Sequence, residues 1–408
     1  MKYESYKDSG VEWIGKVPSH WVVAAFKRKI TINNGKDYKD FLDEEIYPVM
    51  GSGGCFAYCS KYMFDGEALL LGRKGTIDKP LYINGKFWAV DTMFYATPHK
   101  DLNCKFAYYL ALTFPFQLYS TSTALPSMTQ TDLGNNPVAF PPIVEQQAIA
   151  LYLDKKCEEI DRAIDTQKKK IELLNELKQT IITNAVTKGL NPDVPMKDSG
   201  VEWIGKVPVH WNVMKTSLCF SGIGSGTTPS TSNKDYYSES DGLNWLQTGD
   251  LNDGIIEGTS KQISEVAAKD YNLKFYPINS IVIAMYGATI GKVGLLKINT
   301  ATNQACCVLP PSHICYPQFA HMIFIAAKRQ LLVDAMGGGQ PNISQDTIKK
   351  LKIAIPPLNE QEAIISFLEQ EIAEIDLKMV KTKKHIELLN ELKQSIITEA
   401  VTGKVKVC

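Results

Sequence analysis

The stretch Ile171-Glu-Leu-Leu-Asn-Glu-Leu-Lys-Gln-Thr-Ile-Ile-Thr-Asn-Ala-Val-Thr187 determines how this chain is organised, because it occurs twice. Its second copy, residues 386–402, is identical at 15 of 17 positions and differs only at Thr180/Ser395 and Asn184/Glu399. In both copies apolar residues recur at helical spacing, and both copies follow a Pro-Pro and then a Glu-Gln. The chain is therefore built around a repeated helix.

A second repeat lies upstream of each helix. Lys7-Asp-Ser-Gly-Val-Glu-Trp-Ile-Gly-Lys-Val-Pro18, followed by His20-Trp21, returns unchanged at residues 197–208, followed by His210-Trp211. We call these two segments the signatures, and expect their histidines to be structural. The signature repeats after 190 residues and the helix after 215, so the second half carries 25 more residues between them. The signatures and helices match, whereas the segments between them differ in length. This pattern indicates a pseudo-two-fold tandem repeat in which the same signature and helix enclose two different inserts.

The helical pattern extends upstream of each repeated stretch. It predicts a helix over residues 145–187, which is 43 residues long, and an equivalent helix in the second half. Apolar residues three, four and seven positions apart form one stripe that would pair the two helices. The stripe contains Ile149, Leu153, Ile160, Ile171, Leu174 and Ile181 in the first helix, and Ile364, Leu368, Ile375, Ile386, Leu389 and Ile396 in the second.

Chain order predicts that the two long helices pack antiparallel, with one insert at each end. The alternative is a helical bundle core without a spacing role. Lysine runs at 168–170 and 381–384 interrupt the stripe, so one continuous helix and a kinked or two-part helix both fit the pattern.

Both inserts have an α+β pattern. Short apolar runs bounded by Gly, Asn and Asp predict strands at 67–71, 87–90 and 280–284. Asn84-Gly85 predicts a tight hairpin turn, and helices are expected at 106–116 and 321–336. The expected domains are two recognition domains, at residues 1–140 and 191–355, and two helical regions, at residues 141–190 and 356–408.

Composition favours a soluble globular protein. The hydrophobic fraction is 44%, no run of apolar residues is long enough to cross a membrane, and no signal peptide is expected. Nine scattered cysteines fit reduced thiols in the cytoplasm, and no metal site is expected. The formal net charge is zero and there are only four arginines, so phosphate contacts would come mostly from lysine, hydroxyl, amide and backbone groups.

The sequence carries no recognisable catalytic motif. Gly287-Ala-Thr-Ile-Gly-Lys-Val293 lacks the spacing of a phosphate-binding loop, and no Asn-Pro-Pro-Tyr methyltransferase motif is present. No nuclease carboxylate–lysine cluster or metal-binding histidine pair stands out either. We therefore expect a chain that binds and positions but does not catalyse. The rivals are a non-enzymatic scaffold whose inserts bind proteins, and an enzyme with catalysis of its own.

Together these motifs resemble the specificity (S) subunit of a type I restriction–modification system. The resemblance covers essentially the whole chain. The motifs that carry it are Ser9-Gly-Val-Glu-Trp-Ile-Gly15, the Pro-Pro-x-x-Glu-Gln at 141–146 and 356–361, Arg73-Lys-Gly-Thr-Ile77, Gly224-x-Gly-x-Thr-Pro229, Ala288-Thr-Ile-Gly291 and Gln340-Pro-Asn-Ile-Ser344. The first insert departs from the pattern, because it has Leu125-Pro-Ser-Met-Thr129 and lacks the Gly-x-Gly-x-Thr-Pro loop.

The resemblance implies a fold, a function and partners. Two target recognition domains would each read one half of a split double-stranded DNA target. The helices would act as a ruler and would dock two methyltransferase (M) subunits, which restriction (R) subunits would join. S-adenosylmethionine, ATP and Mg would belong to those partner subunits, and this chain would hold no cofactor.

The best candidates for reading bases are polar residues in glycine-rich loops, since glycine allows close backbone approach. Arginine and lysine suit guanine, and amides suit adenine. A solvated turn or a turn cap is the alternative interpretation at each position. The candidates are Arg73, Lys74, Thr76, Ser127 and Thr129 in the first insert, and Tyr286, Thr289, Lys292, Gln340, Asn342, Ser344 and Gln345 in the second.

Overall fold

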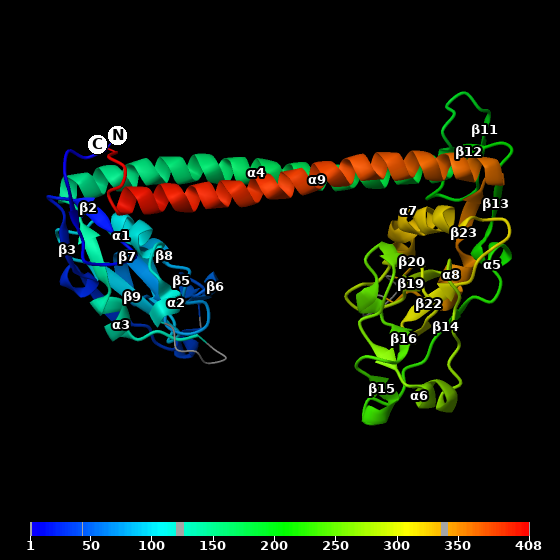
Figure 1. Cartoon of the computed structure of the whole chain (residues 1–408), viewed down its shortest axis with the longest axis horizontal. Coiled ribbons are helices and arrows are strands. Elements are labelled where there is room, and N and C mark those ends of the chain that lie inside the picture. Colours follow the sequence, from blue (N-terminus) through cyan, green and yellow to red (C-terminus); the bar gives the residue numbers. More distant parts are fainter. Residues whose placement is uncertain (1, 43, 120–125, 336–341, 408) are drawn as a thin grey trace. The chain divides into compact units, whose positions relative to one another are not determined.

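A computed structural model of the chain describes residues 2–42, 44–119, 126–335 and 342–407. Its contacts form two compact units (Figure 1). The first unit comprises Met1–Lys169 and Thr382–Cys408, and the second unit comprises Lys170–Lys381. Each unit therefore contains one signature, one insert and a part of each long helix. The predicted α+β tandem repeat is confirmed.

The first unit is built on a six-stranded sheet. Its strand order is β4-β9-β7-β8-β5-β6, and α1 packs against β7, β8 and β9. Two further strand pairs, β1 with β2 and β3 with β10, flank the sheet in the chain. The bounds are β1 Tyr6–Asp8, β2 Lys16–Pro18, β3 Val22–Ala25, β4 Ile30–Asn34, β5 Tyr47–Gly51, β6 Gly54–Cys59, β7 Phe64–Gly72, β8 Leu81–Ala89, β9 Met93–Pro98, α1 Cys104–Ala111, α2 Phe116–Tyr119, α3 Gln130–Asn135 and β10 Pro137–Phe140.

The second unit contains a five-stranded sheet, order β14-β22-β19-β20-β17, and a four-stranded sheet, order β15-β18-β16-β21. Strand pairs β11 with β12 and β13 with β23 repeat the arrangement of the first unit. The bounds are β11 Met196–Asp198, β12 Lys206–Pro208, β13 Asn212–Lys215, α5 Thr216–Cys219, β14 Gly224–Ser225, β15 Tyr237–Ser238, β16 Leu243–Leu246, β17 Gly254–Ile256, β18 Gln262–Ile263, α6 Glu265–Asp270, β19 Ile281–Ala284, β20 Val293–Leu296, β21 Ala301–Thr302, β22 Cys306–Leu309, α7 Pro317–Ala335, α8 Gln345–Lys350 and β23 Lys352–Ile355.

The two long helices are continuous. α4 spans Ile143–Lys188 and α9 spans Leu358–Val401, which are 46 and 44 residues. The prediction of residues 145–187 is confirmed to within two residues at each end. Neither lysine run breaks its helix, so the continuous alternative is the right one.

Within each unit the parts of α4 and α9 run antiparallel. In the first unit the Lys393 ammonium donates to Asp161 at 2.7 Å, while Ile149 shares a buried cluster with Val401. Residue numbers therefore rise along one helix as they fall along the other. In the second unit Lys178 donates to Asp376 at 2.8 Å in the same way.

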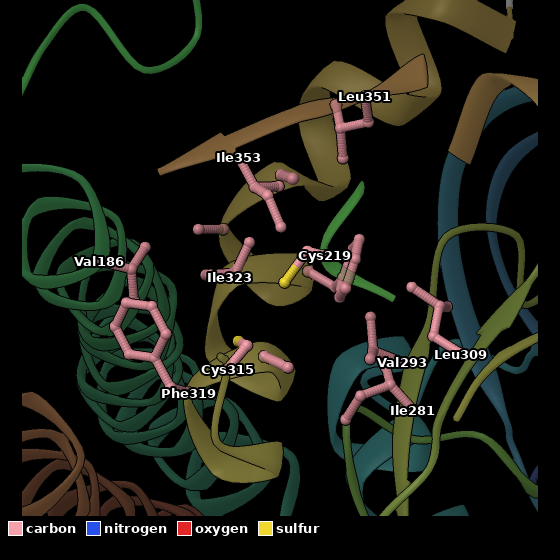
Figure 2. Packing of buried hydrophobic residues seen from close by; sticks show 14 of the residues in the cluster. Val186, Cys219, Ile281, Val293, Leu309, Cys315, Phe319, Ile323, Leu351 and Ile353 are labelled. Carbon is pink, nitrogen blue, oxygen red and sulfur yellow. The ribbon is translucent and has the colours of Figure 1, made fainter. Parts of the chain in front are cut away.

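The predicted apolar stripe is buried most deeply in the N-terminal half of each long helix. The buried members are Ile149, Leu153, Ile160, Ile364, Leu368 and Ile375, and the half-buried members are Ile171, Leu174, Ile181, Ile386, Leu389 and Ile396. Within the repeated stretch the most buried apolar residues are not on the predicted stripe. They are Ile182, Ala185 and Val186 and their equivalents Ile397, Ala400 and Val401. Figure 2 shows Val186 beside Phe319 of α7 in the core of the second unit.

The glutamate of the repeated Glu-Gln pair attaches each signature to a long helix. Glu145 lies in the first turn of α4, where a carboxylate is favoured by the helix dipole. One of its oxygens accepts from the buried indole of Trp21 at 3.0 Å, and the other lies 2.6 Å from His20 Nε2. Glu360 holds His210 and Trp211 identically, at 2.6 and 2.9 Å. The structural role predicted for both histidines is confirmed.

Two local predictions are wrong. The helix expected at 106–116 ends at Ala111, and a separate short helix begins at Phe116. Asn84-Gly85 does not form a hairpin turn but lies inside β8, which pairs continuously with β7. Gly85 has a positive φ of 119° and lies opposite Gly66, whose φ is 138°. The two glycines let both strands bend at one place, so long-range pairing overrides the local turn propensity.

Candidate nucleic-acid interface

Three loops of the first unit meet on the backbone of Arg73, directly after β7. The Arg73 amide donates to the Thr92 carbonyl at 2.8 Å, and the Arg73 carbonyl accepts from the Met128 amide at 3.0 Å. We call the loops at residues 73–76, 90–93 and 126–129 the first junction. One residue thus fixes three loops that are far apart in the sequence.

This junction brings the predicted residues of the first insert together. Lys74 and Ser127 form an isolated antiparallel bridge, and the Gly75 amide donates to the Pro126 carbonyl at 2.9 Å. The sequence identified residues 73–76 and 126–129 as separate candidates, and the structure places them side by side.

The second unit has the same arrangement on Met285, directly after β19. The Met285 amide donates to the Ala305 carbonyl at 2.8 Å, and its carbonyl accepts from the Ile343 amide at 2.8 Å. We call the loops at residues 285–292, 303–305 and 342–345 the second junction. Met128 and Ile343 occupy the same place in the two junctions, although the sequences around them differ.

A glycine allows a further loop to lie against each junction. In the first unit a Cβ on Gly35 would lie 1.9 Å from the Val90 carbonyl oxygen. In the second unit a Cβ on Gly226 would lie 1.6 Å from the Thr302 carbonyl oxygen. No side chain fits at either position, because the nearest atom is backbone that cannot rotate away. The first insert lacks the Gly-x-Gly-x-Thr-Pro motif, but its loop at Gly35 is the structural counterpart of the loop at Gly226.

The side chains of the first junction are cationic and polar. The Arg73 guanidinium lies 5.8 Å from the centre of the Phe94 ring, and its Nη1 donates to the Asp91 carbonyl at 3.4 Å. Lys74 is exposed and Thr76 is half-buried. Arg73 is thus held in place by an aromatic face while part of it still reaches solvent.

The side chains of the second junction are mostly uncharged. Tyr286, Thr289 and Lys292 are half-buried in the turn that Gly287 and Gly291 make possible with φ values of 86° and 75°. Across from this turn, Asn342 and Ser344 are exposed, and Gln345 is half-buried and accepts from Lys349 at 3.2 Å. Gln340 lies outside the described residues.

Two of the candidates cap helices. The Thr129 hydroxyl accepts from the Asp132 amide at 3.1 Å at the start of α3. The Ser344 hydroxyl accepts from the Thr347 amide at 3.0 Å at the start of α8. These hydroxyls satisfy helix N-termini, which is the capping role that the sequence left open for such residues.

An aspartate fastens the turn of the second junction to the rest of its unit. Asp253 has a left-handed backbone, with φ of 65°. Its carboxylate accepts from the Val293 amide at 2.9 Å and from the Lys328 ammonium of α7 at 3.0 Å. The buried His321 of α7 is close enough to feel this carboxylate, but desolvation dominates and lowers the pKa of His321 to about 4.

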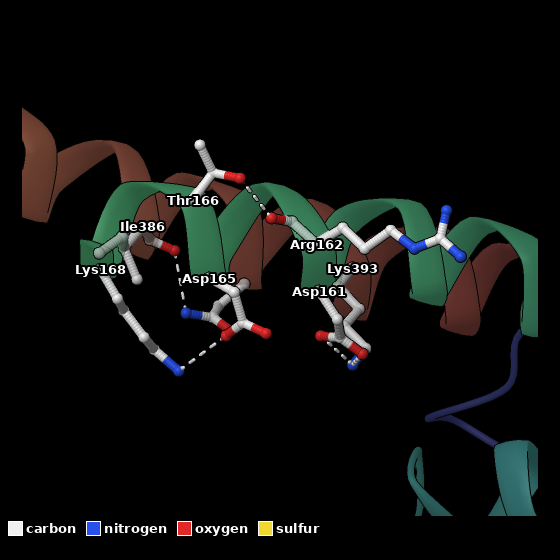
Figure 3. A network of polar contacts seen from close by, with 8 residues as sticks. Asp161, Arg162, Asp165, Thr166, Lys168, Ile386 and Lys393 are labelled. Carbon is white, nitrogen blue, oxygen red and sulfur yellow. Dashed lines mark hydrogen bonds and ion pairs between the residues drawn. The ribbon is translucent and has the colours of Figure 1, made fainter. Parts of the chain in front are cut away.

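The lysine runs of the long helices are partly engaged in local ion pairs. Figure 3 shows Lys168 beside Asp165, at 3.5 Å, on the same helix as the Asp161 that binds Lys393. Lys384 likewise lies 3.2 Å from Glu387. Lys168 and Lys384 lie on solvated helix faces, where such pairs contribute little.

One loop of the second junction was not among the predicted candidates. Residues 303–305 contain Gln304, which is exposed and whose amide oxygen accepts from the Thr228 hydroxyl. Thr228 was visible in the Gly224-x-Gly-x-Thr-Pro229 motif, but nothing in the sequence connects it with Gln304.

Several kinds of site are not found in the part of the chain that the structure describes. No group of His, Cys, Asp or Glu among those residues could hold a metal ion. The eight cysteines in the described part are all free. Within the same residues, no helix is both long enough and apolar enough to cross a membrane.

Comparisons with known proteins agree with this architecture. Residues 19–176 and 208–388 match the family model described as type I restriction modification DNA specificity domain. The putative type I restriction enzyme MjaX specificity subunit of Methanocaldococcus jannaschii is 28% identical over 290 residues, which are 69% of this chain and 62% of that protein. The type I restriction enzyme EcoBI specificity subunit of Escherichia coli is 22% identical over 70% of this chain, and 62% of that protein is likewise covered. This chain therefore spans less than two thirds of the length of these two relatives.

Another relative matches almost end to end. The type I restriction enzyme MjaVIII specificity subunit of Methanocaldococcus jannaschii is 25% identical over 96% of this chain and 94% of that protein. A solved chain from work on complex assembly and conformational transition of the type I R-M system has a TM-score of 0.72 and 16% identity, covering 95% of this chain and 99% of that chain. That likeness shows a shared fold. With two matched copies of the domain, this chain belongs to the family of type I restriction–modification specificity subunits.

Proposed function

We propose that the chain is the non-catalytic, sequence-specific DNA-binding subunit of a type I restriction–modification complex, and that it reads an asymmetric split target. The observation that carries this proposal is the pair of junctions. Both units fasten three loops to one backbone residue, Arg73 or Met285, by the same two kinds of hydrogen bond. The exposed side chains on those loops differ, so each unit would read a different half-site in double-stranded DNA.

The repeated stretch supports docking of two M subunits. Leu173 and Leu177 are 64% and 46% exposed on α4, and their equivalents Leu388 and Leu392 are 50% and 48% exposed on α9. Large exposed apolar side chains that recur in identical positions indicate contact surfaces. Each copy of the repeated stretch thus offers one exposed leucine pair, which would bind one M subunit. S-adenosylmethionine, ATP, Mg and the R subunits would then be contributed by the assembled complex.

Methylome sequencing tests the DNA-reading part of the proposal. Cells that contain active M subunits are compared with and without this gene. We expect adenine methylation at one split motif to disappear with the gene. If no split-motif methylation depends on the gene, the proposed function is wrong.

Copurification tests the docking part. Leu173→Asp combined with Leu177→Asp should reduce the M subunits retained by the chain by about half, because the charges would be buried in the α4 contact while the equivalent surface on α9 stays intact. Leu151→Asp is the matched control, since Leu151 is 72% exposed on the same helix and its repeat equivalent is Ser366. Equal retention by all three proteins would exclude the leucine surface as the docking site.

A further inference from the structure

The exposed tip of the 303–305 loop is anchored on both sides by hydrogen bonds. The Asn303 amide donates to the Leu246 carbonyl at 3.0 Å, and the Asn303 side chain accepts from the Ala305 amide at 3.2 Å. Ala305 in turn accepts from Met285 at the centre of the second junction. Gln304, between these two anchored residues, is exposed.

The side chain of Gln304 is oriented by a second loop. The Thr228 hydroxyl donates to the Gln304 amide oxygen. Thr228 is half-buried and belongs to a fixed segment, since the Thr227 amide donates to the Thr302 carbonyl at 3.0 Å. The Thr227 carbonyl also accepts from the buried indole of Trp245 at 3.2 Å. The amide oxygen of Gln304 is therefore held by a hydroxyl on an anchored segment.

The hydrogen-bonding groups that remain on Gln304 match an adenine. An amide oxygen can accept two hydrogen bonds and an amide nitrogen can donate two. Thr228 uses one acceptor site, and no described residue accepts from the amide nitrogen of Gln304. One acceptor site and both donors thus remain on an exposed side chain, and one of each is the pair that glutamine uses towards adenine N6 and N7 in the major groove.

A solvated turn residue is the competing interpretation, and the orientation of the side chain argues against it. Fixing a glutamine rotamer costs conformational entropy, which a solvated surface side chain without a ligand retains. A side chain that must present two groups at once to a planar base benefits from being fixed before binding.

We propose that Gln304 reads an adenine in the half-site of the second unit, and that Thr228 is its positioning residue. This assignment rests on the proposed function. It adds to the predicted readers a residue from a loop that no sequence motif had indicated.

The test uses the complete complex with its M subunits and a pool of duplexes in which each half-site is randomised. Gln304→Ala should reduce discrimination by about tenfold or more at a single base position. The other half-site should keep its preference. Thr228→Val should weaken discrimination at the same position, and Thr228→Ser, which keeps the hydroxyl, should behave as the parent chain does. Gln370→Ala is the control, because Gln370 is an exposed glutamine of the same unit on α9.

The outcomes separate this assignment from the proposed function. An unchanged preference in Gln304→Ala overturns the assignment while the split target stands. A normal preference in Thr228→Val overturns the positioning role. If Gln304→Ala abolishes methylation, binding is compared on duplexes carrying each of the four bases at every half-site position. Equal loss on all duplexes overturns the assignment, and loss confined to one base supports it. A parent complex that methylates no split target overturns the proposed function itself.

Discussion

The two junctions have the same backbone connections but opposite side-chain character. In the first, the central residue is Arg73, whose guanidinium is held over Phe94 and reaches solvent. In the second, the central residue is Met285, which is buried, and the exposed polar groups come from neighbours such as Gln304 and Asn342. In both units, therefore, main-chain hydrogen bonds set the geometry of the loops. Side chains can then vary without disturbing the frame, which suits a pair of modules that read different sequences.

The strongest way to break this equivalence is to place a methyl group where each junction has none. Gly35→Ala and Gly226→Ala would each force a Cβ against a backbone carbonyl oxygen, at 1.9 and 1.6 Å. Each variant should lower the free energy of unfolding of its own unit by about 3 kcal/mol, as overpacking does when the neighbour cannot move. Urea denaturation followed by peptide-resolved hydrogen exchange would show which unit is affected.

Matched controls exist in both units. Gly53→Ala and Gly249→Ala introduce a Cβ that meets nothing within 4 Å, and should change the free energy of unfolding by less than about 1 kcal/mol. A loss confined to one of the two junction variants would show that the two junctions are not mechanically equivalent.

The parts of the fold that could be predicted from sequence were those with long periodicity or an internal copy. The helical pattern from 145 to 187 persists over many turns, so its ends fell within two residues of α4. The Asn84-Gly85 turn was wrong because the decisive partner, Gly66, lies on another strand and is invisible to a local rule.

The candidate site was predicted only in pieces. Residues 73–76 and 126–129 were found separately because each carries polar residues next to glycine or proline, but their contact depends on the fold. Gln304 was missed because Thr228, which orients it, is 76 residues away. Conversely, Thr129 and Ser344 were predicted to read bases, but their hydroxyls cap the N-termini of α3 and α8. Such capping depends only on the neighbouring residues.

The two units should also respond differently to acid. His321 of α7 is buried, its Nε2 has no partner among the described residues, and its pKa is lowered to about 4 by burial. An unfolded histidine titrates near 6.5, so between these values the unfolded state binds more protons. This contribution to stability is complete above about pH 6.5 and is lost as the pH falls towards 4. From pH 7.5 to 5, it should cost the second unit about 2 kcal/mol.

His321→Leu isolates this effect from the titration of carboxylates. Unfolding of parent and variant is measured at both pH values through the amides of α7, with the amides of α1 as the internal reference. The acid-induced loss at α7 should be about 2 kcal/mol smaller in the variant, while α1 should not distinguish the two proteins. An equal loss at α7 in both proteins would show that His321 already binds its proton in the folded chain.

The smallest expected difference concerns the ion pairs that recur between the long helices. Lys393 meets Asp161 at 2.7 Å and Lys178 meets Asp376 at 2.8 Å, and in each pair the aspartate side chain is about half exposed, at 53% and 49%. Solvent screens such pairs, so Lys393→Met and Lys178→Met should each cost the corresponding unit less than about 1 kcal/mol. Methionine retains the apolar stem that packs along the helix, so what is removed is chiefly the charge. The two losses should match each other and shrink together when the salt concentration is raised, because both pairs occupy equivalent positions of the repeat. If one unit alone lost much more than about 1 kcal/mol in its free energy of unfolding, its lysine would stabilise more than the helix pair. The two ion pairs would then not be equivalent.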